Sequence, residues 1–187
     1  MADLIEEETN EPNSSKTIYL DYNATTPLAP SVLSSIHETL RDAWGNPSSS
    51  HESGRKAKEV IQCARSRVAK MIGARETDII FTSGGTEANN TVFSSVLEYY
   101  NTFIANKNEC NALLKHIPHA ITSNIEHDSI VLELGHLRDS GHCEETVVKA
   151  SPLSGMVEVE SILQEIRPNT CIVSIMMANN ETGVIQV

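Results

Sequence analysis

The sequence lacks most of the features that mark metal-binding, secreted and membrane-spanning proteins. Its four cysteines are widely spaced and form no C-x-x-C pair, which argues against a zinc site or a disulfide framework. No run of residues approaches the roughly 18 consecutive apolar residues of a transmembrane helix. Aromatic residues are scarce, and the net charge of −11 argues against a general binder of nucleic acid or anionic membranes. These absences are typical of a cytosolic protein with reduced thiols.

The N-terminus has little positive charge, which excludes two common targeting signals. Residues 1–16 carry five acidic residues against the single Lys16, and they predict a disordered acidic tail. A secretory signal needs a basic start and an apolar stretch, whereas a mitochondrial transit peptide is rich in arginine and poor in acids. We therefore expect a protein of the cytosol. The length of 187 residues fits one domain, or a domain and a fragment of another.

Short apolar runs alternate with segments whose apolar residues recur at helical spacing. The runs predict strands at residues 17–20, 79–81, 119–123, 146–150 and 171–178. The first helix is expected to begin near Pro30 and to end at Gly45. The second, residues 54–71, is expected to bury Ala57, Ile61, Ala64, Val68 and Met71, and the third to bury Ala88, Val92, Val96 and Tyr100. Two further helices carry Ile130, Leu134 and Leu137, and Val159, Ile162, Leu163 and Ile166; residues 101–118 are expected to form a surface excursion.

This alternation predicts an α/β fold in which helices cover a parallel sheet. Residues 171–178 are apolar on both faces except at Ser174, as expected for a buried strand of such a sheet. Ligands of open α/β sheets bind beyond the carboxyl ends of the strands. Polar clusters follow three of the predicted strands and predict a site at this edge: residues 82–86, 124–129 and 179–183.

The chain is organised around residues 81–87 (FTSGGTE), which join a predicted strand to a predicted helix. Gly84 and Gly85 permit positive φ and let a ligand approach the backbone, and Ser83 and Thr86 add hydroxyl donors. Free N–H groups at the start of a helix bind anions, so this turn can hold one phosphate. The sequence has neither the Gly-Lys-Ser/Thr of a nucleoside-triphosphate loop nor the G-x-G-x-x-G of a dinucleotide site. A helix cap, in which a hydroxyl bonds the same N–H groups, remains the alternative.

Five motifs stand in an order and spacing that resemble one enzyme family. They are residues 21–27 (DYNATTP), 45–49 (GNPSS), 81–87 (FTSGGTE), 126–127 (EH) and 179–183 (NNETG). Together they resemble the cysteine desulfurase and selenocysteine lyase branch of the class V aminotransferases, which depend on pyridoxal 5'-phosphate (PLP). The resemblance covers about residues 17–187 and is strongest to the selenocysteine lyases of animals.

The resemblance implies a PLP-dependent transferase fold of type I, truncated in this chain. Residues 17–187 would form the N-terminal segment and the first part of the PLP-binding large domain. PLP would be the cofactor, held by Gly85 and Thr86 at its phosphate, by His127 over its pyridine ring and by Asn180 at the mouth of a strand. His127 would also be the catalytic group that assists proton transfer.

The resemblance further implies that Asn23, Ala24 and Thr25 line the pocket or the seam of a homodimer. The residues alone leave ordinary structural roles open, since asparagine is common in turns and at strand ends, and a lone histidine beside a strand end is more often structural. Glu87 is expected to complement the helix dipole rather than to catalyse. Ordinary structural roles are expected for three more residues, loop structure for Asn46 and His51 and core packing for Cys171.

PLP chemistry needs a lysine that forms a Schiff base with the cofactor. In this family it lies in a Ser-x-His-Lys segment beyond the Asn-Asn-Glu motif, and none of the seven lysines here has that context. The carboxylate for the pyridine nitrogen, the cysteine that accepts the chalcogen and the arginine for the substrate carboxylate are missing as well. We therefore expect the N-terminal half of an enzyme, inactive by itself.

The resemblance implies that the full-length protein converts L-selenocysteine to L-alanine and reduced selenium. One alternative is a cysteine desulfurase that supplies sulfur, which relative turnover of the two amino acids would distinguish. Another is a catalytically dead product that acts only as a binding or dimerising fragment. A Rossmann-type dehydrogenase is disfavoured because the glycine spacing is wrong.

Overall fold

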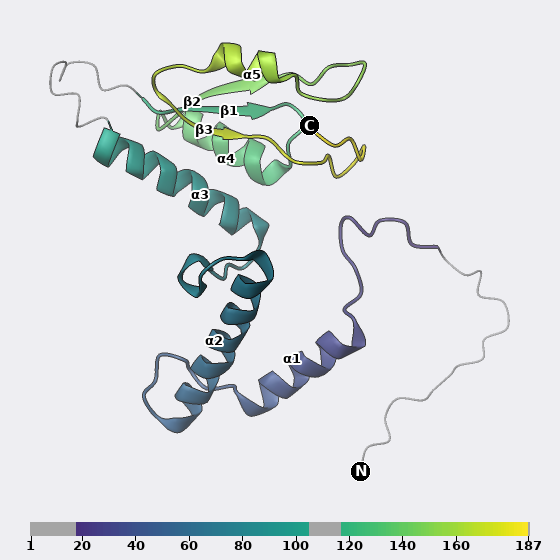
Figure 1. Cartoon of the computed structure of the whole chain (residues 1–187), viewed down its shortest axis with the longest axis vertical. Coiled ribbons are helices and arrows are strands. Elements are labelled where there is room, and N and C mark those ends of the chain that lie inside the picture. The colour runs from purple at the N-terminus through teal and green to yellow at the C-terminus, as the bar shows by residue number, and fades with distance from the viewer. Residues whose placement is uncertain (1–17, 105–116, 187) are drawn as a thin grey trace. The chain divides into compact units, whose positions relative to one another are not determined.

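The computed structural model describes residues 18–104 and 117–186. The predicted acidic tail and most of the predicted surface excursion therefore lie outside the described residues. The chain divides into two compact units, Met1–Met71 and Ile72–Val187 (Figure 1). The described part of the first contains helices, and the second is built around a parallel sheet.

The described part of the first unit contains the helices α1 (Pro30–Asp42) and α2 (Glu52–Ile72). Pro30 begins α1 as predicted. The helix ends before Ala43, whose N–H donates to the carbonyl of Thr39, so the prediction that Gly45 caps this helix is wrong. Gly45 serves a different purpose, because a Cβ there would lie 2.3 Å from the carbonyl oxygen of Ser53 near the start of α2. Glycine permits this close approach of two backbones.

The apolar face predicted for α2 is only partly buried. Ala57 is buried as expected, but Ile61 and Ala64 are exposed and Met71 is 77% exposed. Helical spacing places these side chains on one face, but their burial needs a partner surface that the described unit does not provide. The strand predicted at 17–20 is also wrong in its described part, where residues 18–20 form no regular structure.

The second unit contains three described strands in the order β2-β1-β3, and all pairs are parallel. The strands are β1 (His119–Ser123), β2 (Glu144–Val148) and β3 (Thr170–Ser174). The parallel α/β architecture is thus confirmed, and β1 has the predicted bounds. β2 lies two residues earlier than predicted, and β3 ends four residues sooner. The central strand β1 is buried along its whole length.

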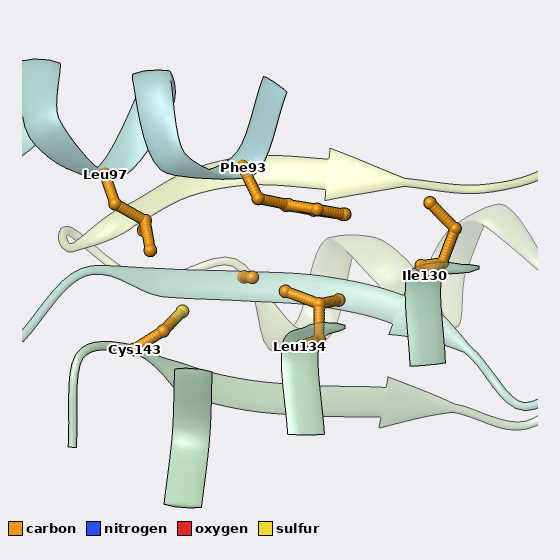
Figure 2. Close-up of a cluster of buried hydrophobic side chains, with 6 residues drawn as sticks. Phe93, Leu97, Ile130, Leu134 and Cys143 are labelled. Atoms are coloured by element: carbon orange, nitrogen blue, oxygen red, sulfur yellow. The ribbon is translucent and has the colours of Figure 1, made fainter. Parts of the chain in front are cut away.

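Helices cover both faces of this sheet (Figure 1). They are α3 (Gly85–Tyr99), α4 (Asp128–Asp139) and α5 (Val159–Glu165). The short helix η1 (Glu76–Asp78) precedes α3, and η2 (Tyr100–Ile104) follows it directly. A core cluster joins α3 and α4 to one face of β1, as Figure 2 shows: Phe93, Leu97, Ala120, Ile130, Leu134 and Cys143. Ile121 points to the opposite face, where it packs with Val148 and Val157. Successive side chains of β1 point to opposite faces of the sheet, so this strand contributes to the core on both faces.

The buried face of α3 differs from the prediction. Phe93 and Leu97 are buried with Tyr100, whereas Val92 is 52% exposed. The predicted set and the observed set both follow helical spacing, so the period alone could not select between them. Burial of the larger Phe93 ring removes more apolar surface from water than burial of Val92.

Residues 79–81 were predicted to be a buried strand, and this prediction is wrong. Ile79 has extended backbone angles, with φ −102° and ψ 123°. No described strand pairs with this segment, and Ile80 and Phe81 are 73% and 50% exposed. Val173 of β3 is also more exposed than predicted, because β3 has a described neighbour on one side only.

Candidate functional site

The glycine turn is the start of α3, as the sequence predicted. Gly84 precedes the helix with φ 168°, an extended conformation that any residue adopts, so the expected use of positive φ at this pair is wrong. The glycines instead leave the backbone accessible, since a Cβ at Gly84 or Gly85 would meet no atom within 4 Å. The N–H groups of Gly85 and Thr86 lie in the first turn, where a helix offers no backbone acceptor.

Glu87 closes this turn from within the helix. Its Oε2 accepts a hydrogen bond from the N–H of Ser83 at 2.6 Å, and this bond lowers the pKa of the Glu87 carboxyl below its usual value. A carboxylate in the first turn also complements the helix dipole. Thr82 Oγ1 donates to the carbonyl of Gly84 at 3.1 Å. The predicted non-catalytic role of Glu87 agrees with these contacts.

His127 is the N-cap residue of α4, where its ring has two contacts to Ser129. Nδ1 accepts from the N–H of Ser129 at 3.0 Å, and Ser129 Oγ lies 2.9 Å from the same nitrogen. Asn89 on α3 donates through Nδ2 to Ser129 Oγ at 2.8 Å. The two helices are therefore joined by a chain of hydrogen bonds that ends on the His127 ring.

A cavity of about 240 Å³ brings the glycine turn and His127 together. It is lined by Thr86, Asn90, His127, Asp128, Ser129, Leu132 and Glu133. The Asn90 Oδ1 atom is buried and has no hydrogen-bond partner in the described chain. A buried amide oxygen without a partner is costly, so a ligand or a water molecule that donates a hydrogen bond would be favoured here.

Two side chains hold the loops at the carboxyl ends of β1 and β3 together. Glu126 Oε1 accepts from Ser123 Oγ at 2.6 Å and from the N–H of Met176 at 2.9 Å. Asn179 donates through Nδ2 to the carbonyl of Ile125 at 2.9 Å, and its Oδ1 accepts two N–H groups of the 179–183 loop. The exposed Asn180 thus lies on a loop that is tied to the segment before His127.

The other predicted positions lie elsewhere in the chain. Asn23, Ala24 and Thr25 belong to the first unit and are exposed, with Ala24 in a turn closed by its N–H to the carbonyl of Asp21. Their role in a pocket or a dimer seam stays a prediction. Asn46 and His51 make local hydrogen bonds to Ser48 and Gly54, as expected of loop structure.

Cys171 packs against the core cluster, and burial raises the pKa of its thiol. The core role predicted for this cysteine is therefore confirmed.

The second unit combines a parallel sheet between helices with a cavity lined by the start of α3 and by His127. Together with the similarity to a solved NifS-like protein, this architecture is that of a PLP-dependent transferase of fold type I. A solved structure titled "NIFS-LIKE PROTEIN" is similar over 90% of this chain and 42% of its own length, with a TM-score of 0.77 and 32% identity. The family model for Aminotransferase class-V matches residues 18–187, and the chain belongs to this family.

Two curated relatives show which members of the family this chain is similar to. The chain is 54% identical over 185 residues to a selenocysteine lyase of Xenopus tropicalis, covering 99% of this chain and 42% of the relative. It is 39% identical over 171 residues to the cysteine desulfurase IscS of Dictyoglomus turgidum, covering 91% of this chain and 40% of the relative. The chain thus spans about two fifths of the length of these relatives. In the described residues, no helix is long and apolar enough to cross a membrane.

Members of this family and their relatives use PLP, so the predicted cofactor is confirmed at the level of the family. The described residues fit its phosphate, since Gly85 and Thr86 present N–H groups and the space in front of the glycines is open. Asn90 also lines the adjoining cavity, but its buried Oδ1 is a hydrogen-bond acceptor and does not contribute to phosphate binding. Among the residues that the structure describes, no lysine or arginine lines this cavity, so a cation that balances a phosphate must come from other residues.

Sequence reasoning found Thr86 and His127 but missed Asn89 and Ser129, which are hydrogen-bonded to one another and, through Ser129, to His127, and Asn90, which lines the same cavity. Asn89 and Asn90 follow Thr86 at helical spacing, and this spacing was a usable signal. Ser129 follows His127 by two residues, as expected of a capping partner. The role of Glu126 as a tie between β1 and β3 depends on contacts 50 residues apart, which no local pattern predicts.

Proposed function

We propose that this chain belongs to a longer protein, called here the complete protein, that acts as a PLP-dependent selenocysteine lyase. The observation that carries the proposal is the cavity that Thr86 and His127 both line, which would allow one ligand to meet both residues. The higher identity to a selenocysteine lyase than to a desulfurase favours L-selenocysteine as the substrate. The products would be L-alanine and reduced selenium.

Each predicted site residue has a role in this proposal. Gly85 and Thr86 bind the cofactor phosphate through their N–H groups, and the Thr86 hydroxyl adds a donor. His127 lies against the pyridine ring and assists proton transfer, and Asn180 orients the cofactor or substrate from the neighbouring loop. PLP, when bound, draws electrons from the substrate so that its Cα proton leaves and its Cβ–Se bond breaks.

Substrate preference tests the choice of selenium over sulfur. Turnover of L-selenocysteine and L-cysteine by the complete protein is compared through alanine release, with a thiol reductant present. We expect selenocysteine to be strongly preferred. Comparable rates would favour the alternative, a cysteine desulfurase, which the similarity to IscS supports.

The role of Thr86 can be tested by cofactor affinity. Thr86→Val removes a hydroxyl at the cavity, and Thr91→Val is the matched control, because the Thr91 hydroxyl bonds the carbonyl of Glu87 inside the same helix. We expect only the first change to weaken PLP binding, by about 10-fold for one lost charge-assisted hydrogen bond. Equal affinities in both variants would mean that the Thr86 hydroxyl does not bind the phosphate.

We further propose that the 187-residue chain is inactive by itself, because none of its seven lysines lies in a Ser-x-His-Lys segment and none lines the cavity among the described residues. The complete protein would be a cytosolic homodimer, with residues 23–25 at the pocket or the seam. Intact mass of the native protein after borohydride reduction tests whether this chain is part of a longer protein that carries PLP. A mass well above that of 187 residues, with one pyridoxyl-phosphate adduct per chain, would support it. The mass of this chain without an adduct would instead favour the second alternative, a short product that only binds or dimerises.

A further inference from the structure

The contacts around His127 determine which ring nitrogen carries its proton. Nδ1 accepts the N–H of Ser129 at 3.0 Å, and a nitrogen that accepts a hydrogen bond has no proton of its own. A neutral His127 therefore has its proton on Nε2. Ser129 Oγ lies 2.9 Å from Nδ1 and must donate its hydrogen to it, because Nδ1 has none to give.

Asn89 supports the same direction of donation. Its Nδ2 donates to Ser129 Oγ at 2.8 Å, which occupies one lone pair of that oxygen and leaves the hydroxyl hydrogen for His127. Ser129 is buried, so water competes little for its hydroxyl. The hydrogen bonds run in one direction, from the Asn89 amide through the Ser129 hydroxyl to Nδ1 of His127.

We propose that Asn89 and Ser129 are positioning residues that hold His127 in the tautomer with the proton on Nε2. The part of this proposal that concerns the reaction rests on the proposed function. There, His127 assists proton transfer as a donor: it meets the cofactor or substrate through Nε2–H and does not remove a proton with that nitrogen.

The chain contains a second serine–histidine pair with the opposite arrangement. Ser140 Oγ donates to the carbonyl of His136 at 2.8 Å, so its one hydrogen is used, and it lies 2.8 Å from Nδ1 of His142. The carbonyl of Leu137, 3.2 Å from the same oxygen, is a second acceptor for that hydrogen. With its hydrogen on these carbonyls, the Ser140 oxygen accepts from His142, which places a proton on Nδ1. The two pairs predict opposite tautomers within one protein, and His142 serves as an internal reference.

The experiment is ¹⁵N solid-state NMR of the complete protein, without cofactor, with ring-labelled histidine at a pH where the rings are neutral. His127→Gln and His142→Gln assign the two sets of signals by difference. We expect a protonated Nε2 in His127 and a protonated Nδ1 in His142. A protonated Nδ1 in His127 would overturn the proposal, whatever activity the protein has.

Three variants test the two positioning residues. Asn89→Asp keeps the shape but can only accept, so it reverses the hydrogen bond to Ser129, and Ser129→Ala removes the hydroxyl. Each should shift the tautomer ratio of His127 toward the Nδ1–H form by about two- to tenfold, the net worth of one hydrogen bond. Ser129→Thr should restore the wild-type ratio, and Ser140→Ala should leave it unchanged.

An unchanged ratio in both Asn89→Asp and Ser129→Ala would assign the tautomer to the backbone N–H alone and overturn the role of the two side chains. If Asn89→Asp does not fold, as judged by circular dichroism, the comparison of Ser129→Ala with Ser129→Thr decides. A lyase assay of the same variants then tests the link to the reaction separately. Suppose that the wild-type complete protein shows the expected His127 tautomer but no lyase activity. That result would count against the proposed function and would leave the positioning roles of Asn89 and Ser129 unaffected.

Discussion

His119 is the most constrained single residue of the second unit. Its side chain is buried in the central strand, and its ring bridges both neighbours, with Nδ1 2.8 Å from Thr170 Oγ1 and Nε2 2.9 Å from Thr146 Oγ1. Burial lowers the pKa of His119, and the nearby Arg167 lowers it further, while Glu144 and Glu165 act in the opposite direction. The folded protein therefore favours a neutral ring at this position.

This depressed pKa predicts a loss of stability in acid. An unfolded histidine titrates near pH 6.5, so the stability from neutral His119 is present above that pH and is lost as pH falls toward the lower folded value. The difference in unfolding free energy between wild type and His119→Gln should shrink between about pH 7 and pH 5. Urea denaturation of the complete protein measures it. His136→Gln, at an exposed site, is the control, and a pH-independent difference for His119→Gln would contradict the prediction.

Glu126 is a second residue whose substitution should lower stability, because two hydrogen-bond donors share its Oε1 as acceptor. Glu126→Ala would leave the buried hydroxyl of Ser123 and the N–H of Met176 without an acceptor. We expect a loss of about 1–3 kcal/mol for an unpaired buried polar group, measured by denaturation. Glu98→Ala, at an exposed position on α3, should change stability by less than about 0.5 kcal/mol. Equal losses of stability in the two variants would mean that the Glu126 hydrogen bonds between the loops after β1 and β3 do not stabilise the fold.

At the scale of elements, α4 provides a matched pair of leucines. Leu134 is completely buried in the core cluster, whereas Leu132 on the same helix is 68% exposed (Figure 2). Leu134→Ala should destabilise the complete protein by about 2–5 kcal/mol, the range for buried leucines, and Leu132→Ala should cost far less. Thermal and urea unfolding measure both. Similar costs for the two leucines would mean that α4 does not pack on the sheet through this face.

The elements also explain how far the sequence alone could predict the fold. The strand at His119–Ser123 and the helix that buries Ile130 and Leu134 carry local periods, and both predictions are confirmed. The segment 79–81 has the composition of a strand but no described partner, and pairing is a non-local property. The predicted strand over 171–178 was too long for the same reason, since its pairing with β1 ends at Ser174.

The site was predictable to a similar degree. Thr86 and His127 stand in recognisable motifs, and both line the cavity. Asn89 and Ser129 meet over a separation of 40 residues, and Asn179 reaches back 54 residues to Ile125. Such contacts arise only when the strands have aligned, so the sequence could name the groups that face a ligand but not the groups that hold them.

At the scale of the whole molecule, many large apolar side chains remain exposed in the described residues. On α1, Leu40 is 70% exposed, Trp44 just beyond the helix is 75% exposed, and α1 has no buried residue. Monomeric soluble proteins rarely expose apolar patches of this extent without a partner surface. In the second unit, the two edge strands of the described sheet also present backbone groups without a described strand partner.

These surfaces predict how the isolated 187-residue chain should behave. We expect it to elute from gel filtration as aggregates and to bind a hydrophobic dye strongly, despite its net charge of −11, because charge does not cover apolar faces. Leu40→Gln should reduce dye binding, and Glu38→Gln, on the same helix, should not. The complete protein should be monodisperse and bind little dye. A sharp monomeric peak of the isolated chain, with a cooperative thermal transition, would show instead that these apolar faces need no further chain to cover them.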